Sequence, residues 1–440
     1  MKIGGIEVRT FFAALCGVLA AASAPALDFK VVRNHEDCLY KCGETAVFTV
    51  TAYETNDVLA TSGTVSWTLD GFETGKVLAS GTFDLSKANP FKISGTRTTP
   101  GFLKILLTAK GYEPRWNLAG WSVGYEPLKI RKASPSPSDF DAFWAGARAR
   151  LAREVPLDVR LTPYPEKSTA DYDYYRFSLA TFGRRLYGFF STPKDRSKRY
   201  PARVQVASAG WGNWTNFQPG KKGMVFLWFS VYPFEPSWDW QTDGTTEKYQ
   251  AMNRECRAKW GYGDYANAGF SGTREDPFFY SVILGIDRAV DWLAGLPFVD
   301  VADITYQGGS QSGGLGLYLL GLNHRFRKGV TTVPALTDVM GYRLGRVSGW
   351  PTPWESANTP ERKARVDANL PYYDAANFAS RVTCPIRLSV GFRDRICPPP
   401  CVYAAYNEIR AEKDIYTAVD HGHGMPDRMH GAYVRWLEEK

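Results

Sequence analysis

The sequence predicts an α/β protein whose main domain contains a doubly wound, mostly parallel sheet and follows a smaller all-β domain. Two patterns indicate this division. Up to about residue 130, short segments alternate polar and apolar residues, whereas beyond residue 139 continuous apolar segments alternate with helical ones. With 440 residues, 44% of them hydrophobic and 22% charged, the chain is long enough for two buried cores.

The first 26 residues have the pattern of an export signal. Lys2 and Arg9 precede an apolar stretch from Thr10 to Leu19, and two small-x-small cleavage patterns end at Ala24 and Ala26. The stretch is too short to span a bilayer, and no other apolar run of about 18 residues occurs. We therefore expect residues 1–26 to be a cleaved signal peptide, and the mature protein to be secreted or periplasmic and not bound to a membrane.

The net charge of +8 is spread along the chain. The lysines and arginines form no cluster of the kind that follows a phosphate backbone, so we expect no nucleic-acid partner.

Residues 27–132 are predicted to form an immunoglobulin-like β-sandwich. Residues 64–69 alternate polar and apolar side chains, and Asp70 and Gly71 supply a turn. Further strand candidates at residues 46–53, 77–85 and 102–109 have the spacing of such a sandwich. A packing domain is the favoured interpretation, and sugar binding is the alternative.

The α/β domain is predicted to span residues 139–440, after a stiff polar linker at residues 133–138. Ser138 is the expected cap of the first helix. The segments 203–207 and 225–231 are continuous apolar runs, which is typical of buried parallel strands. A long amphipathic helix is expected at residues 277–293, and later strands are expected at 303–306, 386–390 and 415–419.

A serine flanked by glycines follows the strand candidate 303–306. Ser310 lies within Gly308–Gly314, and an apolar helix candidate follows. Strand, glycine-flanked serine and helix make up the nucleophile elbow, usually Gly-x-Ser-x-Gly, although Ser312 stands where the last glycine is expected. The turn could instead bind phosphate, but no lysine follows it as a P-loop requires. The pattern favours Ser310 as a nucleophile.

A serine needs a base and an orienting carboxylate. The glycine-containing loop 420–424 after the last strand candidate makes His423 the favoured base, with His421 and then His430 as alternatives. Asp394 directly follows the strand 386–390 and is the candidate acid. The order Ser310, Asp394, His423 is that of α/β-hydrolases.

Several segments resemble the acetyl xylan esterase and cephalosporin-C deacetylase family of α/β-hydrolases. They are the elbow, the acid motif Gly391–Pro399, the entry helix Asp139–Trp144, Tyr372–Asp374 and Asn377–Ala379. The resemblance implies a serine esterase that removes acetyl groups from xylan-like polysaccharides or oligosaccharides through an acyl-enzyme, without a cofactor. It also implies Ser310, Asp394 and His423 as the triad and a possible homo-oligomer.

The chain departs from the family pattern at two loops and at its N-terminus. Residues 232–236 replace an Arg-Gly-Gln-Gly turn, Gly424 replaces a glutamate after the histidine, and the β domain is an addition. These departures leave the expected triad intact but bear on substrate choice and oligomeric state.

An oxyanion hole is expected beside the nucleophile. One donor is the backbone N–H of Gln311, and by the resemblance the second is that of Ala209. Trp211 and Trp214, and less so Trp238 and Trp240, are candidates for stacking on sugar rings, although tryptophan packs in cores more often.

Six cysteines remain beyond the export signal: Cys38, Cys42, Cys256, Cys384, Cys397 and Cys401. Export permits disulfides, and six cysteines allow 15 pairings. Cys38 and Cys42 are close enough in sequence to bridge within the β domain, and we favour that pair. The histidines and cysteines do not have zinc-ligand spacing, so we expect no metal.

Two other functions fit the sequence less well. A serine peptidase of the same fold would need a means of holding a peptide, and no propeller-like repeat precedes the α/β domain. A non-catalytic carbohydrate-binding protein would not need the three triad candidates.

Overall fold

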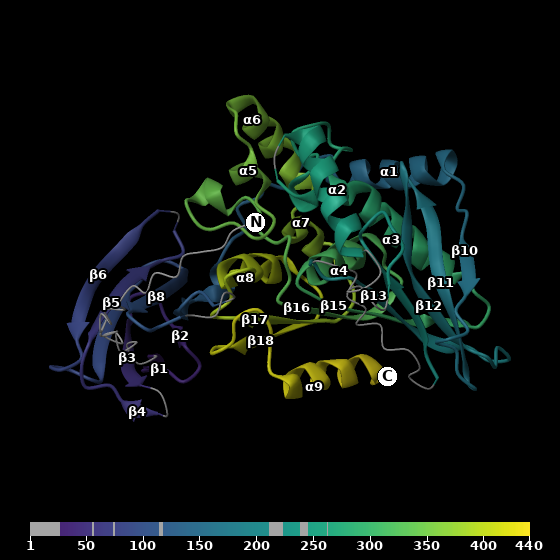
Figure 1. Cartoon of the computed structure of the whole chain (residues 1–440). Coiled ribbons are helices and arrows are strands. Elements are labelled where there is room, and N and C mark those ends of the chain that lie inside the picture. Colours follow the sequence, from purple (N-terminus) through teal and green to yellow (C-terminus); the bar gives the residue numbers. More distant parts are fainter. Residues whose placement is uncertain are drawn as a thin grey trace, which may run out of the picture.

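The computed structural model describes residues 27–54, 57–73, 75–113, 118–210, 223–237, 245–261 and 263–440. The predicted signal segment lies outside these residues. Figure 1 shows an N-terminal β region (residues 28–125) beside a larger C-terminal α/β region (residues 139–440). The immunoglobulin-like assignment and the exact domain boundaries remain predictions.

The N-terminal β region contains two sheets. β3 is the central strand of the first sheet and alternates buried and half-buried side chains, as expected for a strand with one face in the core. The first sheet consists of β1 (Asp28–Arg33), β3 (Thr45–Glu54), β4 (Val58–Leu59) and β7 (Phe91–Thr96). The second has the order β2 (Leu39–Tyr40), β9 (Trp121–Tyr125), β8 (Gly101–Ala109), β5 (Thr64–Asp70), β6 (Val77–Asp84).

The C-terminal α/β region is built on a mixed nine-stranded sheet. Every pair from β14 to β18 is parallel, and the pairs that involve β10, β11 and β12 are antiparallel. The strand order is β10 (Arg160–Pro163), β11 (Tyr172–Thr181), β12 (Arg184–Pro193), β14 (Val225–Phe229), β13 (Tyr200–Val206), β15 (Val299–Gly309), β16 (Phe326–Thr332), β17 (Ile386–Gly391), β18 (Lys413–Ala418).

Helices pack on both faces of this sheet. In Figure 1, α9 lies on one side and α4, α7 and α8 lie on the other. The apolar runs predicted as buried strands are in the middle of the sheet, and all five residues of β14 are buried. The helices are α1 (Phe140–Glu154), α2 (Thr245–Trp260), α3 (Phe278–Ala294), α4 (Gln311–Leu322), α5 (Pro353–Ser356), α6 (Pro360–Asn369), α7 (Ala375–Ala379), α8 (Pro399–Glu408) and α9 (Asp427–Glu438).

The start of α1 differs from the prediction. The N-cap is Asp139 rather than Ser138, and no side chain caps the helix. The Asp139 carboxylate is turned away because it accepts hydrogen bonds from Tyr372 and Arg274. This tertiary contact explains why Asp139 stands at the N-cap position without capping the helix through its side chain.

The predicted linker is fastened to the C-terminal region along its length. Ser134 is only 2% exposed, and Ala133 N–H donates to Asp338 Oδ1 at 2.6 Å. Asn377 Nδ2 donates to the Pro135 carbonyl oxygen at 2.8 Å. The polar linker is therefore bonded to the C-terminal region although Pro135, Ser136 and Ser138 are exposed, because the buried Asp338 and Asn377 need polar partners.

The two regions adjoin at the β17–β18 edge of the large sheet (Figure 1). Their buried apolar side chains form one continuous core. The Phe102 ring lies edge-on to Phe392, with 5.1 Å between centroids, and tilted to Tyr403 at 5.8 Å. The side chain of Arg33, 4% exposed, forms an ion pair with Asp420 at 2.8 Å. The N-terminal region is thus packed against its neighbour rather than tethered to it.

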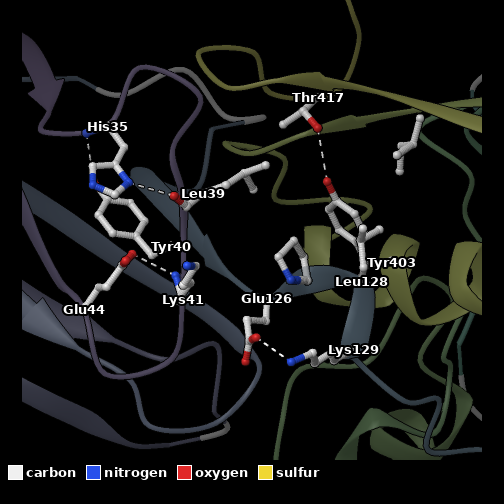
Figure 2. A pocket seen from close by; sticks show the side chains of 12 residues that line it. His35, Leu39, Tyr40, Lys41, Glu44, Glu126, Leu128, Lys129, Tyr403 and Thr417 are labelled. Atoms are coloured by element: carbon white, nitrogen blue, oxygen red, sulfur yellow. Dashed lines mark hydrogen bonds and ion pairs between the residues drawn. The ribbon is translucent and has the colours of Figure 1, made fainter.

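A pocket of about 560 Å³ also lies between the two regions. Figure 2 shows His35 and Tyr40 on one side of it and Tyr403 and Thr417 on the other. Several of its polar groups are paired: the Tyr403 hydroxyl lies 3.1 Å from Thr417 Oγ1, and the His35 ring lies 2.8 Å from the Leu39 carbonyl oxygen. The pocket therefore offers mainly apolar surface.

The six cysteines beyond the signal segment are all free. The expected bridge between Cys38 and Cys42 is wrong. Cys38 is buried, and its Sγ instead accepts a hydrogen bond from Arg33 Nε at 3.0 Å. Among the described ranges, no helix is long and apolar enough to cross a bilayer.

Candidate active site

Ser310 lies in the tight turn that joins β15 to α4. Its backbone has φ 59° and ψ −127°, a strained conformation for a residue with a side chain that costs about 1–3 kcal/mol. The turn needs glycine neighbours, because a Cβ on Gly314 would lie 2.2 Å from the Ala335 carbonyl oxygen and one on Gly308 2.7 Å from Ser312 Oγ. Close packing of backbone against backbone therefore holds the strained serine in place.

Ser312 stands where the elbow motif has its last glycine. Gly309 N–H donates to Ser312 Oγ at 2.8 Å, and the Ser312 hydroxyl donates to the Gly309 carbonyl oxygen at 2.9 Å. The side chain is buried. Serine can replace glycine here because its hydroxyl closes the turn from inside, and the same bonds occupy the hydroxyl.

The structure brings Ser310, His423 and Asp394 into one hydrogen-bonded chain. His423 Nε2 lies 2.8 Å from Ser310 Oγ, and His423 Nδ1 lies 2.8 Å from Asp394 Oδ2. A carboxylate can only accept, so Nδ1 carries the ring proton and Nε2 is free to accept the serine proton. The His423 side chain is 18% exposed and Asp394 is fully buried. The chain therefore runs from the core to an accessible hydroxyl.

The alternative histidines have other contacts. His430 Nε2 lies 3.4 Å from Gln307 Nε2. His421 contributes its backbone carbonyl oxygen, which accepts from Arg393 N–H at 2.9 Å. Loop 419–424 therefore presents His423 and not His421 to the serine.

Asp394 is fixed by the loop that follows β17. Its Oδ1 accepts from the backbone N–H groups of Ile396 at 2.7 Å and Cys397 at 2.9 Å, which leaves Oδ2 for His423. Cys397 Sγ lies close enough to complete a three-residue group with Asp394 and His423, whose possible ligand atoms lie within 4.8 Å of one another. A metal there would have to displace the Asp394–His423 hydrogen bond. Burial raises the pKa of the Cys397 thiol well above its usual range.

The loop after β13, which carries Ala209, is tied to the elbow. Ser208 Oγ donates to the Gly309 carbonyl oxygen at 3.1 Å, and the Gln311 side-chain amide donates to the Ala207 carbonyl oxygen at 3.2 Å. Gln311 also starts α4, so its own N–H is at the end of a helix, where backbone donors have no partner inside the helix. The structure thus places the two predicted oxyanion donors on neighbouring segments.

Two tyrosines that sequence reasoning did not single out hold this arrangement. The Tyr265 hydroxyl donates to Gln311 Oε1 at 2.6 Å, and the Tyr232 hydroxyl donates to the Gly210 carbonyl oxygen at 2.9 Å. Both are fully buried, and burial raises the pKa of each hydroxyl, so both remain protonated donors. Tyr232 begins the segment that departs from the family pattern, which is the one sequence signal that pointed to it.

Trp211, Trp214, Trp238 and Trp240 all lie outside the described residues. Their role in sugar binding stays a prediction.

Comparison with known proteins identifies the family. Residues 125–440 match the model of the acetyl xylan esterase (AXE1) family. The chain is also 29% identical to the acetyl esterase Axe7A of Xylanibacter ruminicola over 426 residues, which is 93% of this chain and 90% of that protein. An alignment over 93% of the chain is longer than residues 125–440, so this similarity extends beyond the family match into the N-terminal β region.

Solved structures agree on the fold of the C-terminal region. The acetyl xylan esterase from Paenibacillus sp. R4 has a TM-score of 0.58 at 23% identity, covering 71% of this chain and 98% of that one. Acetyl xylan esterase 1 from Thermoanaerobacterium sp. JW/SL YS485 has a TM-score of 0.57 at 23% identity, covering 71% and 96%. This likeness and the mixed sheet show an α/β-hydrolase-type fold.

The family match covers the whole nine-stranded sheet and the three hydrogen-bonded side chains beyond the carboxyl ends of β15, β17 and β18. The chain therefore belongs to the acetyl xylan esterase family, and it is a carboxylic ester hydrolase that acts on acetylated carbohydrate.

Proposed function

We propose that this protein is a secreted serine esterase that removes acetyl groups from xylan-like polysaccharides or oligosaccharides through an acyl-enzyme on Ser310. The observation that carries the proposal is the chain of two 2.8 Å contacts from Ser310 Oγ through His423 to the buried Asp394. A hydroxyl becomes a competent nucleophile when a base accepts its proton and a carboxylate orients that base.

In the first step, Ser310 Oγ attacks the acetyl carbonyl carbon and His423 Nε2 takes the hydroxyl proton. Asp394 accepts from Nδ1–H and stabilises the imidazolium that forms. The tetrahedral intermediate collapses when the bond between the acetyl carbon and the sugar oxygen breaks. The sugar oxygen takes the proton from His423 and leaves as a free hydroxyl.

In the second step, water enters the place of the sugar and attacks the acetyl-enzyme. His423 takes one proton from the water and returns it to Ser310 Oγ as acetate leaves. No redox partner or cofactor is needed, because each proton that His423 accepts is given back within the cycle.

The negative oxygen of both intermediates needs donors that are already in place. We propose the backbone N–H groups of Gln311 and Ala209. Support comes from Gln311 and Ser208, whose side chains tie the two segments together at 3.2 and 3.1 Å. Removal of one such donor typically lowers turnover by roughly 10²–10³-fold.

Export is the second part of the proposal. It is supported by the basic residues, the apolar stretch and the small-residue cleavage pattern within residues 1–26. N-terminal sequencing of the mature protein should begin at or near residue 25 or 27, and an intact N-terminus in the exported protein would contradict it.

The test is acetate release from 4-nitrophenyl acetate and from acetylated xylan. Ser310→Ala should lower kcat on both substrates by roughly 10⁶-fold, the scale seen when a triad nucleophile is removed. Ser312→Ala is the matched control, because it removes a neighbouring hydroxyl that is already bonded to Gly309. We expect this variant to keep kcat within about tenfold and to lose about 1 kcal/mol of unfolding free energy.

Two outcomes would contradict the proposal. Full activity of Ser310→Ala would remove Ser310 as the nucleophile and direct attention to Ser312. Absence of acetate release by the wild type from both substrates would rule out the acetyl group as the acyl part of the substrate.

A further inference from the structure

The acid loop, residues 391–397, is bonded to the N-terminal β region at three successive residues. The Ser122 hydroxyl donates to the Phe392 carbonyl oxygen, and Ala119 N–H donates to the Arg393 carbonyl oxygen at 2.8 Å. Asp394 itself pairs with Leu118 in an isolated antiparallel bridge. The β region therefore contacts the backbone of the proposed catalytic acid directly.

The side chain of Arg393 strengthens the same contact. Its Nε donates to the Gly120 carbonyl oxygen at 2.8 Å, and its guanidinium lies 4.1 Å from the centre of the Trp121 ring. Gly120 has φ +84°, and a Cβ there would lie 2.1 Å from the Ile105 carbonyl oxygen. Residues 118–122 are therefore packed closely onto β8 and offer the acid loop a fixed edge.

The base loop, residues 418–424, is held by the acid loop and by the β region. Arg393 N–H donates to His421 O at 2.9 Å, and Phe392 N–H donates to Ala418 O at 3.1 Å. Arg33 of β1 donates to Asp420 Oδ1 at 2.8 Å and to Val419 O at 3.4 Å. The acid loop and the base loop are thus both hydrogen-bonded to the β region.

We propose that the N-terminal β region is a positioning part of the active site, which holds the acid and base loops so that Asp394 orients His423. Ser122 and Arg33 are positioning residues that act through the two loops: Ser122 bonds to the Phe392 carbonyl oxygen, and Arg33 bonds to the Asp420 side chain and the Val419 carbonyl oxygen. The inference rests on the proposed function, since it assigns a role relative to the Ser310–His423–Asp394 chain.

The physical reason is that a catalytic triad tolerates little displacement of its side chains. An error of about 1 Å in a catalytic group can lower the rate by about 10²-fold. The acid loop lies between β17 and α8 and has its own contacts to Asp394 through Ile396 and Cys397. Those contacts fix the carboxylate within the loop, whereas the contacts of Ser122 and Ala119 fix the loop relative to the β region.

The first experiment uses Ser122→Ala in the full chain with 4-nitrophenyl acetate as the substrate. We expect kcat to fall by about tenfold while KM stays within about threefold, because only the orientation of the base is impaired. The same change in an Asp394→Asn background should have no further effect, since the residue through which it acts is already lost. An equal loss in both backgrounds, or no loss in either, would overturn the inference.

Thr181→Val is the matched control. Thr181 lies on β11, the second strand from the opposite edge of the sheet, and its buried hydroxyl donates to the Ser281 carbonyl oxygen at 2.8 Å. It removes the same kind of bond at similar burial, so it should lower stability without changing kcat. A tenfold loss of kcat in this control would show that a general loss of stability explains the Ser122 result.

Asp420→Ala keeps the inference testable if Ser122→Ala does not fold. The Asp420 side chain is 65% exposed, so its removal should leave the fold intact. It removes the shorter of the two bonds from Arg33 to the base loop and leaves the 3.4 Å contact to the Val419 carbonyl oxygen. A several-fold fall in kcat at constant KM is expected, and unchanged kcat would count against the inference.

A second readout separates this inference from the proposed function. Diethyl 4-nitrophenyl phosphate labels an activated serine whatever the natural acyl group is. If the wild type is labelled at Ser310 but releases no acetate, the acetyl substrate is wrong and the labelling rates of the variants still test the inference. If acetate is released and Ser122→Ala is labelled as fast as the wild type, the proposed function stands and the inference fails.

Discussion

The nucleophile elbow and the acid loop deliver two members of the same triad, yet they are held by different means. The elbow is held by close packing inside the α/β region: a Cβ on Gly308 would meet Ser312, and a Cβ on Gly314 would meet Ala335, which follows the neighbouring strand β16. The acid loop is held by hydrogen bonds and ring contacts to residues 118–122, at least 270 positions earlier in the chain. One half of the site therefore depends on packing inside the α/β region, and the other depends on the association of two regions.

The largest effect that tests this comparison is expected for Asp394→Asn. The amide can donate to His423 Nδ1 and so favours the wrong ring tautomer, which should lower kcat by about 10⁴-fold with a folded protein. The measurement is kcat on 4-nitrophenyl acetate beside the urea midpoint of unfolding. A loss of less than tenfold would mean that Asp394 does not orient the base.

Gly314→Ala should have the next largest effect, because the added methyl group creates a steric clash in the elbow and changes nothing else. The new methyl group would lie 2.2 Å from the Ala335 carbonyl oxygen, so the turn must shift. We expect a loss of about 1–3 kcal/mol of unfolding free energy and a fall in kcat of at least about 10²-fold.

The matched control for this variant is Gly146→Ala. Gly146 lies on an exposed position of α1, and a Cβ there meets nothing within 4 Å. Because alanine is the better helix former, this change should raise stability by about 1 kcal/mol and leave kcat unchanged. Equal behaviour of the two glycine variants would show that the elbow is not packed as described.

The smallest effect is expected for Tyr265→Phe. It removes the donor to Gln311 Oε1 while the ring keeps its packing, so the side chain that joins the elbow to the Ala209 loop loses one of its two bonds. A fall in kcat of about tenfold and a loss of about 1–2 kcal/mol are expected. Tyr406→Phe on α8 is the control, because Lys413 contacts the backbone carbonyl of Tyr406 and not its hydroxyl. If this variant lost as much kcat, the effect would not be specific to the bond between Tyr265 and Gln311.

Much of the site could be predicted from local patterns. The elbow, the strand before Asp394 and the glycine-flanked His423 each have a recognisable sequence, and their order along the chain matches one fold. The expected Cys38–Cys42 bridge was wrong: both cysteines are free, and Cys38 contacts Arg33 instead, which spacing alone does not reveal. Ser138 was replaced as the helix cap by Asp139, whose own side chain is bound by Tyr372 and Arg274.

The sequence by itself determined the local geometry: a strained serine between small residues, apolar strands for a buried sheet, and a carboxylate and a histidine at strand ends. These features depend on neighbours within a few positions. Only the tertiary structure decided that Ser122 and Arg33 support the acid and base loops, that Tyr265 holds Gln311, and that the linker is packed. Such contacts join residues far apart in the chain, and their donors and acceptors are common side chains and backbone groups that leave no pattern in the sequence.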